Sequence, residues 1–107
     1  MHMGSLITAA RCKNLIHIIF NNNSHDSVGG QLTAGENLNF CNIARSMGYQ
    51  NVYKVRNLKE LKNFIKKSLK SRNNSFIEII CSAGHRNNLV RPNEKPIFNK
   101  NQFMKII

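Results

Sequence analysis

Residues 15–31 of the chain are Leu-Ile-His-Ile-Ile-Phe-Asn-Asn-Asn-Ser-His-Asp-Ser-Val-Gly-Gly-Gln. The apolar, β-branched run Leu15–Phe20 has the length and composition of a buried strand. Amides, a hydroxyl, an imidazole, a carboxylate and two glycines follow it at once, which is not the composition of an ordinary turn. Open α/β folds bind their ligands at the carboxyl ends of parallel strands, and oxygen-rich loops can hold a hard cation. The sequence therefore predicts a ligand site just after this strand.

Two helices and a strand are predicted before the lysine-rich region. Residues from Met3 to about Lys13 have helix-favouring spacing and lead into the first strand. A polar loop follows from Asn21 to about Asn37, a length typical of functional or disordered segments. A second helix is predicted with Asn39 as N-cap and Gly48 as its stop, because the following residues share one helical face: Phe40, Ile43, Ala44 and Met47.

The second half of the chain continues the alternation. Asn51–Val55 alternates like a strand, and Asn57 with Glu60 forms a variant of the capping box. The helix that this box begins should bury an apolar stripe: Leu58, Leu61, Phe64, Ile65 and Leu69. Phe76–Cys81 is the third predicted strand. From about residue 82 the chain is irregular, and Gln102–Ile107 closes it with a short helical turn.

Alternation of helices and strands with short links implies right-handed crossovers and a parallel sheet. The predicted fold class is α/β, with about three strands and flanking helices. That is a partial doubly wound sheet, the second half of a domain, and it spans the chain from residue 1 to 107 as one unit.

The block Phe20–Gln31 resembles the second half of the thiamine diphosphate motif. In that family a Gly-Asp-Gly turn comes first, and an Asn-Asn pair follows one helix and one strand later. The Asp, the second Asn and a backbone carbonyl two residues on hold the magnesium of the diphosphate. The resemblance thus implies that Asn22, through its side chain, and Ser24, through its carbonyl, are Mg²⁺ ligands. A plain Asx turn at Asn22 is the alternative.

His-Asp-Ser and Gly-Gly-Gln at residues 25–31 are similar to the phosphonopyruvate decarboxylase branch of this family, and the likeness extends from Met1 to Met104. It implies a lyase that converts phosphonopyruvate, a 2-oxo acid, to phosphonoacetaldehyde and carbon dioxide. His25 and Asp26 have side chains suited to proton transfer or anion recognition and are the catalytic candidates. Gly29 and Gly30 would let backbone amides approach a phosphate, unless they serve turn geometry alone.

Weaker candidates for substrate binding are Gln31 and Arg86. A similar Gly-x-Arg and Arg-Pro tract occurs in the family where this chain has His85-Arg86 and Arg91-Pro92. A guanidinium could bind a carboxylate or phosphonate bidentately, with structural pairing as the alternative. His17, inside the first strand, is expected to be structural.

No Gly-Asp-Gly occurs in the 107 residues; in the family it would lie just before Met1. The activating Glu of the family belongs to a separate pyrimidine-binding domain. We therefore expect a fragment or subunit that is inactive alone. It should assemble with a pyrimidine-binding domain or subunit as a homo- or hetero-oligomer, because the cofactor lies between chains in this family.

Composition limits the other possibilities. The formal net charge is +11 and the isoelectric point is about 10.2, which would attract nucleic acid. The charge is mostly lysine on one helix, however, without the aromatic–basic interleaving that stacks bases. No run is long enough for a membrane span and no secretory signal is recognisable, so the expected location is the cytoplasm. Three widely spaced cysteines predict buried free thiols.

Three alternatives to phosphonopyruvate decarboxylation remain open from the sequence. The nearest is a sulfopyruvate decarboxylase-like beta subunit that works with a separate pyrimidine-domain chain. A basic nucleic-acid-binding module belongs to another class, and its binding would weaken steeply with salt. The last is a nonfunctional remnant of a truncated gene.

Overall fold

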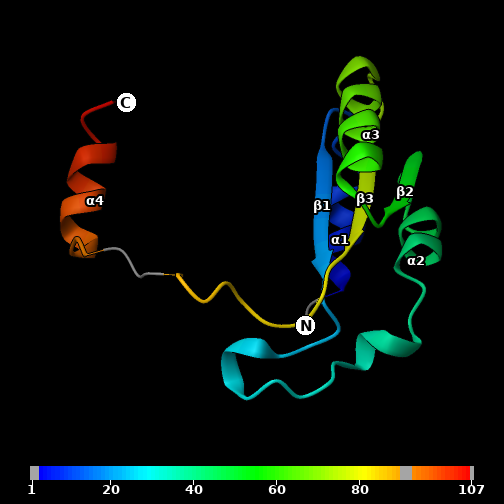
Figure 1. Ribbon diagram of the computed structural model, residues 1–107. Coiled ribbons are helices and arrows are strands. Elements are labelled where there is room, and N and C mark those ends of the chain that lie inside the picture. Colours follow the sequence, from blue (N-terminus) through cyan, green and yellow to red (C-terminus); the bar gives the residue numbers. More distant parts are fainter. Residues whose placement is uncertain (1–2, 90–92, 107) are drawn as a thin grey trace.

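The computed structural model describes residues 3–89 and 93–106 (Figure 1). Helices and strands alternate through most of the chain, as predicted. In chain order the elements are α1 (Gly4–Ala9), β1 (Ile16–Asn21), the 3-10 turns Asp26–Val28 and Ala34–Asn37, α2 (Phe40–Ser46), β2 (Asn51–Val55), α3 (Leu58–Lys70), β3 (Ser75–Ile80) and α4 (Pro96–Phe103).

The three strands form one parallel sheet in the order β1-β3-β2. The expected three-stranded parallel sheet with flanking helices is confirmed. β3 is last in sequence but central in the sheet, and residues 75–78 are fully buried there. Its near-continuous apolar run suits that position, because a central parallel strand is covered on both faces.

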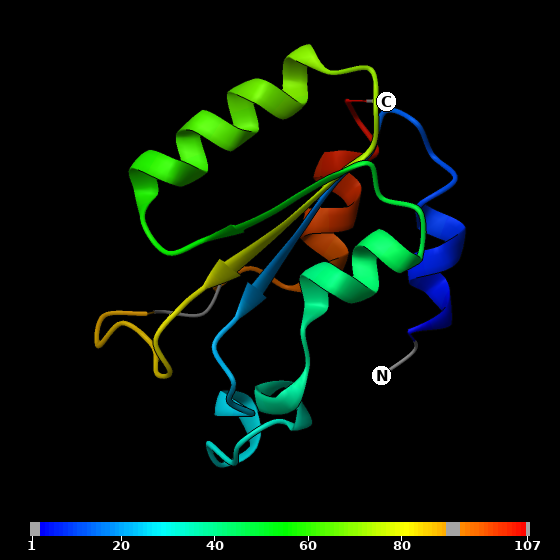
Figure 2. The ribbon, with the colours of Figure 1, turned by 90° about the vertical axis from the view of Figure 1, so that its right-hand side faces the viewer.

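Helices cover both faces of the sheet. α3 lies on one face, and α1 and α2 lie on the other (Figure 2). Since successive side chains of a strand point to opposite faces, Phe76 faces α1 and α2. There it forms the core with Ala10, Ala44 and Tyr49. On the α3 face, Tyr53 of β2 stacks on Phe64 with ring centroids 4.2 Å apart.

Side-chain caps begin α2 and α3 where the sequence predicts them. The Asn39 side chain accepts a hydrogen bond from the Asn42 amide, and Asn57 accepts one from the Glu60 amide. The Glu60 carboxylate reaches back to the Arg56 amide at 3.1 Å, one residue before the capping-box target.

Three expectations are wrong, two about burial and one about the length of the first helix. Leu58 and Leu69 of the predicted stripe are 72% and 71% exposed, and they lie in the first and last turns of α3. The first helix is limited to Gly4–Ala9. Cys12 is exposed and Cys81 half-buried, and only Cys41 is the buried free thiol that was expected; Cys12 follows α1 in a surface turn.

The C-terminal tail is more helical than predicted. α4 begins at Pro96, a residue suited to the first turn of a helix, and continues to Phe103. It lies apart from the sheet (Figure 1), and its apolar side chains Ile97 and Phe103 are exposed. Within the described ranges, none of the helices combines the length and the apolar character needed to cross a membrane.

Candidate cofactor-binding site

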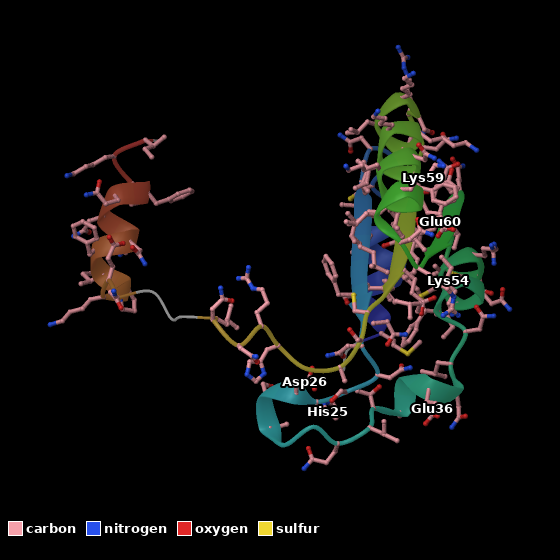
Figure 3. The ribbon with its side chains drawn as sticks, viewed as in Figure 1. His25, Asp26, Glu36, Lys54, Lys59 and Glu60 are labelled. Carbon is pink, nitrogen blue, oxygen red and sulfur yellow. The ribbon has the colours of Figure 1, made fainter. Side chains whose placement is uncertain are left out.

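The polar loop starts where β1 ends. Asn21 closes β1 and lies opposite Ile80, the last residue of β3, and its carbonyl accepts a hydrogen bond from the Cys81 amide at 2.9 Å. The segments that follow both strands therefore leave the same edge of the sheet, with the loop beneath the arrowheads of β1 and β3 in Figure 3. This is the carboxyl edge at which open parallel sheets bind ligands.

Two overlapping Asx turns shape residues 21–24. The side-chain oxygen of Asn21 accepts from the Asn23 amide at 3.2 Å, and that of Asn22 accepts from the Ser24 amide at 3.1 Å. Asn23 has φ 53°, a left-handed conformation that Asn tolerates better than most residues. The turn that was the alternative interpretation of Asn22 is thus present. Its amide oxygen has a second lone pair, so the turn does not prevent ligation.

The Asp26 carboxylate joins two residues of the loop to the segment that follows β3. One oxygen accepts from the Ser24 hydroxyl at 2.6 Å, and the other from the Asn22 side-chain amide at 2.7 Å and from the Gly84 amide at 2.9 Å. These donors, Ser24 first, lower the pKa of Asp26 below its usual value. An ionised carboxylate with three donors is a poor proton donor near neutrality, so this geometry favours positioning and negative charge over proton transfer.

Residues 25–31 close into a compact turn. The His25 amide donates to the Gln31 carbonyl at 2.8 Å, and the His25 carbonyl accepts from the amides of Val28 and Gly30, each at 3.0 Å. Gly29 and Gly30 have φ of 119° and 77°, which only glycine adopts readily. The Gly30 amide is already bonded within the loop, so its contribution is conformational. The His25 and Gln31 side chains are exposed.

The segment after β3 meets the loop at one point. The Gly84 amide bonds to Asp26 and so joins this segment to the loop. The segment residues Ser82–Arg86 line an open hollow. His85 lies near enough to Asp26 to help lower its pKa. Arg86 is exposed. Arg91 and Pro92, the other half of the predicted polar cluster, lie outside the described residues.

Glu78 is a buried acid that the sequence analysis did not select. It lies in the middle of β3, with no exposed surface. One carboxylate oxygen accepts from the Asn21 side-chain amide at 2.8 Å, and the other lies 3.4 Å from the Lys54 ammonium and 3.5 Å from the Cys41 sulfur. The available signal was a single acid in an otherwise apolar strand. Burial, and then the bond to Glu78, raise the pKa of the Cys41 thiol.

The donors gathered here fit a hard cation better than a transition metal. No three His, Cys, Asp or Glu side chains in the described part of the chain come together as a metal-binding group. The loop instead offers the Asn22 amide oxygen and the Ser24 carbonyl, with the Asp26 carboxylate hydrogen-bonded to both residues. Magnesium prefers oxygen ligands and keeps some positions for phosphate or water. The residues present therefore fit part of a magnesium–diphosphate site.

Residues 1–79 match the model of the thiamine pyrophosphate enzyme C-terminal, TPP-binding domain. The chain belongs to this family. Thiamine pyrophosphate is thiamine diphosphate, so the matched domain is the one that binds this cofactor in decarboxylases and related enzymes. The matched region contains β1, the loop and nearly all of β3, the elements that place Asn22, Ser24 and Asp26.

Two relatives narrow the comparison within the thiamine pyrophosphate enzymes. The chain is 30% identical over 98 residues to a phosphonopyruvate decarboxylase of Streptomyces viridochromogenes, covering 90% of the chain and 25% of the relative. It is 32% identical over 98 residues to another of Streptomyces hygroscopicus, covering 90% and 24%. The chain thus spans about a quarter of the length of these curated relatives.

Proposed function

We propose that this chain supplies the diphosphate-binding side of a thiamine diphosphate- and Mg²⁺-dependent 2-oxo acid decarboxylase whose substrate is phosphonopyruvate. The products are phosphonoacetaldehyde and carbon dioxide. The observation that carries the proposal is the loop Asn22–Asp26 at the carboxyl edge of the sheet, where oxygen donors and a carboxylate are hydrogen-bonded to one another. The two relatives named phosphonopyruvate decarboxylase support this substrate.

In this proposal Asn22 and Ser24 hold the metal. Asn22 contributes its side-chain oxygen and Ser24 its backbone carbonyl. Asp26 fixes both residues by accepting hydrogen bonds from their side chains. The negative charge of Asp26 also lowers the local potential for a divalent cation. Thiamine diphosphate, when bound, supplies the electron sink for loss of carbon dioxide.

The remaining loop residues would act on the substrate side. His25 is exposed beside the carboxylate of Asp26 (Figure 3), where its imidazole can face an anion. Gln31 and Arg86 carry an amide and a guanidinium suited to the carboxylate and phosphonate of the substrate. Gly29 and Gly30 give the loop the tight return that places His25 and Gln31 together.

The proposal includes a partner, and sulfopyruvate is the alternative substrate against which it is tested. A pyrimidine-binding domain or subunit would complete the site, in a homo- or hetero-oligomer, so the chain alone should have no decarboxylase activity. Sulfopyruvate differs from phosphonopyruvate in the charge of its terminal group. A beta-subunit role in sulfopyruvate decarboxylation is therefore tested by offering both acids to the chain together with a pyrimidine-domain partner.

The first test is calorimetric titration of the chain with thiamine diphosphate, with and without Mg²⁺. We expect binding that requires Mg²⁺ and is lost in Asn22→Ala, whereas Asn73→Ala, an exposed amide in another turn, binds like the native chain. Circular dichroism of each variant establishes folding. Binding that does not need Mg²⁺, or that Asn22→Ala leaves unchanged, would contradict the proposed metal ligand. Absence of binding by the folded native chain would contradict a usable half-site.

A further inference from the structure

We infer that Glu78 is a buried positioning residue, which holds the Asn22–Ser24 turn in place through the side chain of Asn21. The functional meaning of this inference rests on the proposed function, because the turn that Glu78 holds is the proposed magnesium site. The contacts themselves come from the described residues alone and involve no ligand.

The two carboxylate oxygens of Glu78 have different partners. Among the described residues, Asn21 is the donor to Oε1, at 2.8 Å, while Oε2 faces Lys54 and Cys41. The Lys54 side chain is 42% exposed, so its ammonium balances the charge of the buried carboxylate while it remains partly in contact with water. Lys54 and Cys41 thus hold Oε2, and Oε1 is directed at Asn21, the last residue of β1.

Asn21 transmits this restraint because both ends of its amide are bonded. Its Nδ2 donates to Glu78, and its Oδ1 accepts from the Asn23 amide at 3.2 Å. An amide held at both ends cannot rotate without breaking one bond. The Asn23 backbone is thereby held in its left-handed conformation, from which the next turn, Asn22 Oδ1 to the Ser24 amide, follows directly.

A buried acid at this position needs an explanation other than fold stability. The neighbours of Glu78 along β3 are Ile77 and Ile79, and an apolar residue would suit the central strand equally well. Buried ion pairs are often no more stabilising than well-packed apolar residues, because desolvation offsets the attraction. What an apolar residue could not supply is an acceptor for Asn21, and with it the orientation of the loop.

The decisive experiment reverses the direction of one hydrogen bond. Asn21→Asp sets two carboxylates against each other. The double variant Asn21→Asp/Glu78→Gln lets the new glutamine amide donate to Asp while Asp still accepts from the Asn23 amide. Amide hydrogen exchange of Asn23 and Ser24 is measured by NMR without ligand, and the slowest amides of β3 report global unfolding separately. We expect exchange roughly tenfold faster in the single variant, the scale of one lost hydrogen bond to a charged group, and near-native rates in the double variant.

Asn74→Ala is the matched control, since Asn74 is a buried amide at the opposite end of β3. It should weaken the fold and so speed exchange of the slowest β3 amides, while the protection factors of Asn23 and Ser24, which report local opening of the turn, stay unchanged. Native-like exchange in Asn21→Asp, or no recovery in the double variant, would overturn the inference. If Asn21→Asp does not fold, a folded and protected double variant supports the inference, and an unfolded or unprotected one overturns it.

The same variants separate this inference from the proposed function. In calorimetry, Mg²⁺-dependent binding of thiamine diphosphate should weaken about tenfold in Asn21→Asp and recover in the double variant. If the native chain binds no cofactor, the proposed function fails, yet amide exchange still decides whether Glu78 positions the turn. If binding follows the proposal but exchange does not, only the positioning role fails.

Discussion

Asn74 ties together three segments of the fold at the amino end of the sheet: the start of β3, the end of α1 and the link between α2 and β2. Its side-chain amide donates to the carbonyls of Ala10 and Gly48, and its oxygen accepts from the Gln50 amide at 2.8 Å. The side chain is buried. Replacing Asn74 by Ala would leave these three backbone groups without the side chain that bonds them.

The expected cost follows from how far water can replace each bond. The carbonyl of buried Ala10 loses its partner in the core, at about 1–3 kcal/mol. Gly48 and Gln50 are exposed, so their backbone groups recover part of their bonding from water, at about 0.5 kcal/mol each. The sum is about 2–4 kcal/mol, a large share of the stability of so small a domain.

The measurement is urea denaturation followed by circular dichroism, comparing Asn74→Ala with Asn73→Ala. Asn73 is the exposed neighbour, and its replacement should change the free energy of unfolding by less than about 0.5 kcal/mol. If Asn74→Ala were as stable as Asn73→Ala, the three hydrogen bonds would not hold the helices to the sheet, and this account of the amino end would be wrong.

Three further predictions concern the core, the loop and the thiols. Phe76→Ala removes the central core ring, with an expected loss of about 3–5 kcal/mol, and should leave the chain largely unfolded by circular dichroism. The pKa of Asp26 is lowered in the folded loop, so its contribution is present above the ordinary carboxyl range and is lost as the pH falls through the folded value; a smaller protection factor of the Gly84 amide on acidification, taken relative to its intrinsic exchange rate at each pH, would show this, and an unchanged protection factor would contradict it. Iodoacetamide should label exposed Cys12 well before buried Cys41, whose pKa is raised; equal labelling rates by mass spectrometry would disprove the assigned burial.

Local patterns were sufficient to predict most of the elements. The caps at Asn39 and Asn57 depend on residues within one helical turn, and the structure has both. The extents of α1 and α4 could not be predicted in the same way. Helix length depends on the packing available to each face, and α3 includes Leu58 and Leu69 although both are exposed.

For the candidate site, too, local features could be predicted from the sequence and long-range contacts could not. A run of Asn, Ser, His and Asp after an apolar strand is a local property, and it predicted the ligand loop and the resemblance to thiamine diphosphate enzymes. The roles of Asn22, Ser24, His25 and Asp26 as ligands or catalytic groups stay predictions. The bond from Gly84 to Asp26 spans 58 residues, a separation over which no pattern in the sequence specifies contact.

By itself, the sequence determined the parallel α/β class, the three strands and the loop that follows the first of them, because hydrophobic periodicity and capping act between near neighbours. Only the tertiary structure decided that β3 lies between β1 and β2, and that Glu78 there meets Asn21 and Lys54. Strand order and the partners of a buried charge depend on chain crossovers and on desolvation in the assembled core. Neither can be computed from the residues adjacent to Glu78 in the chain.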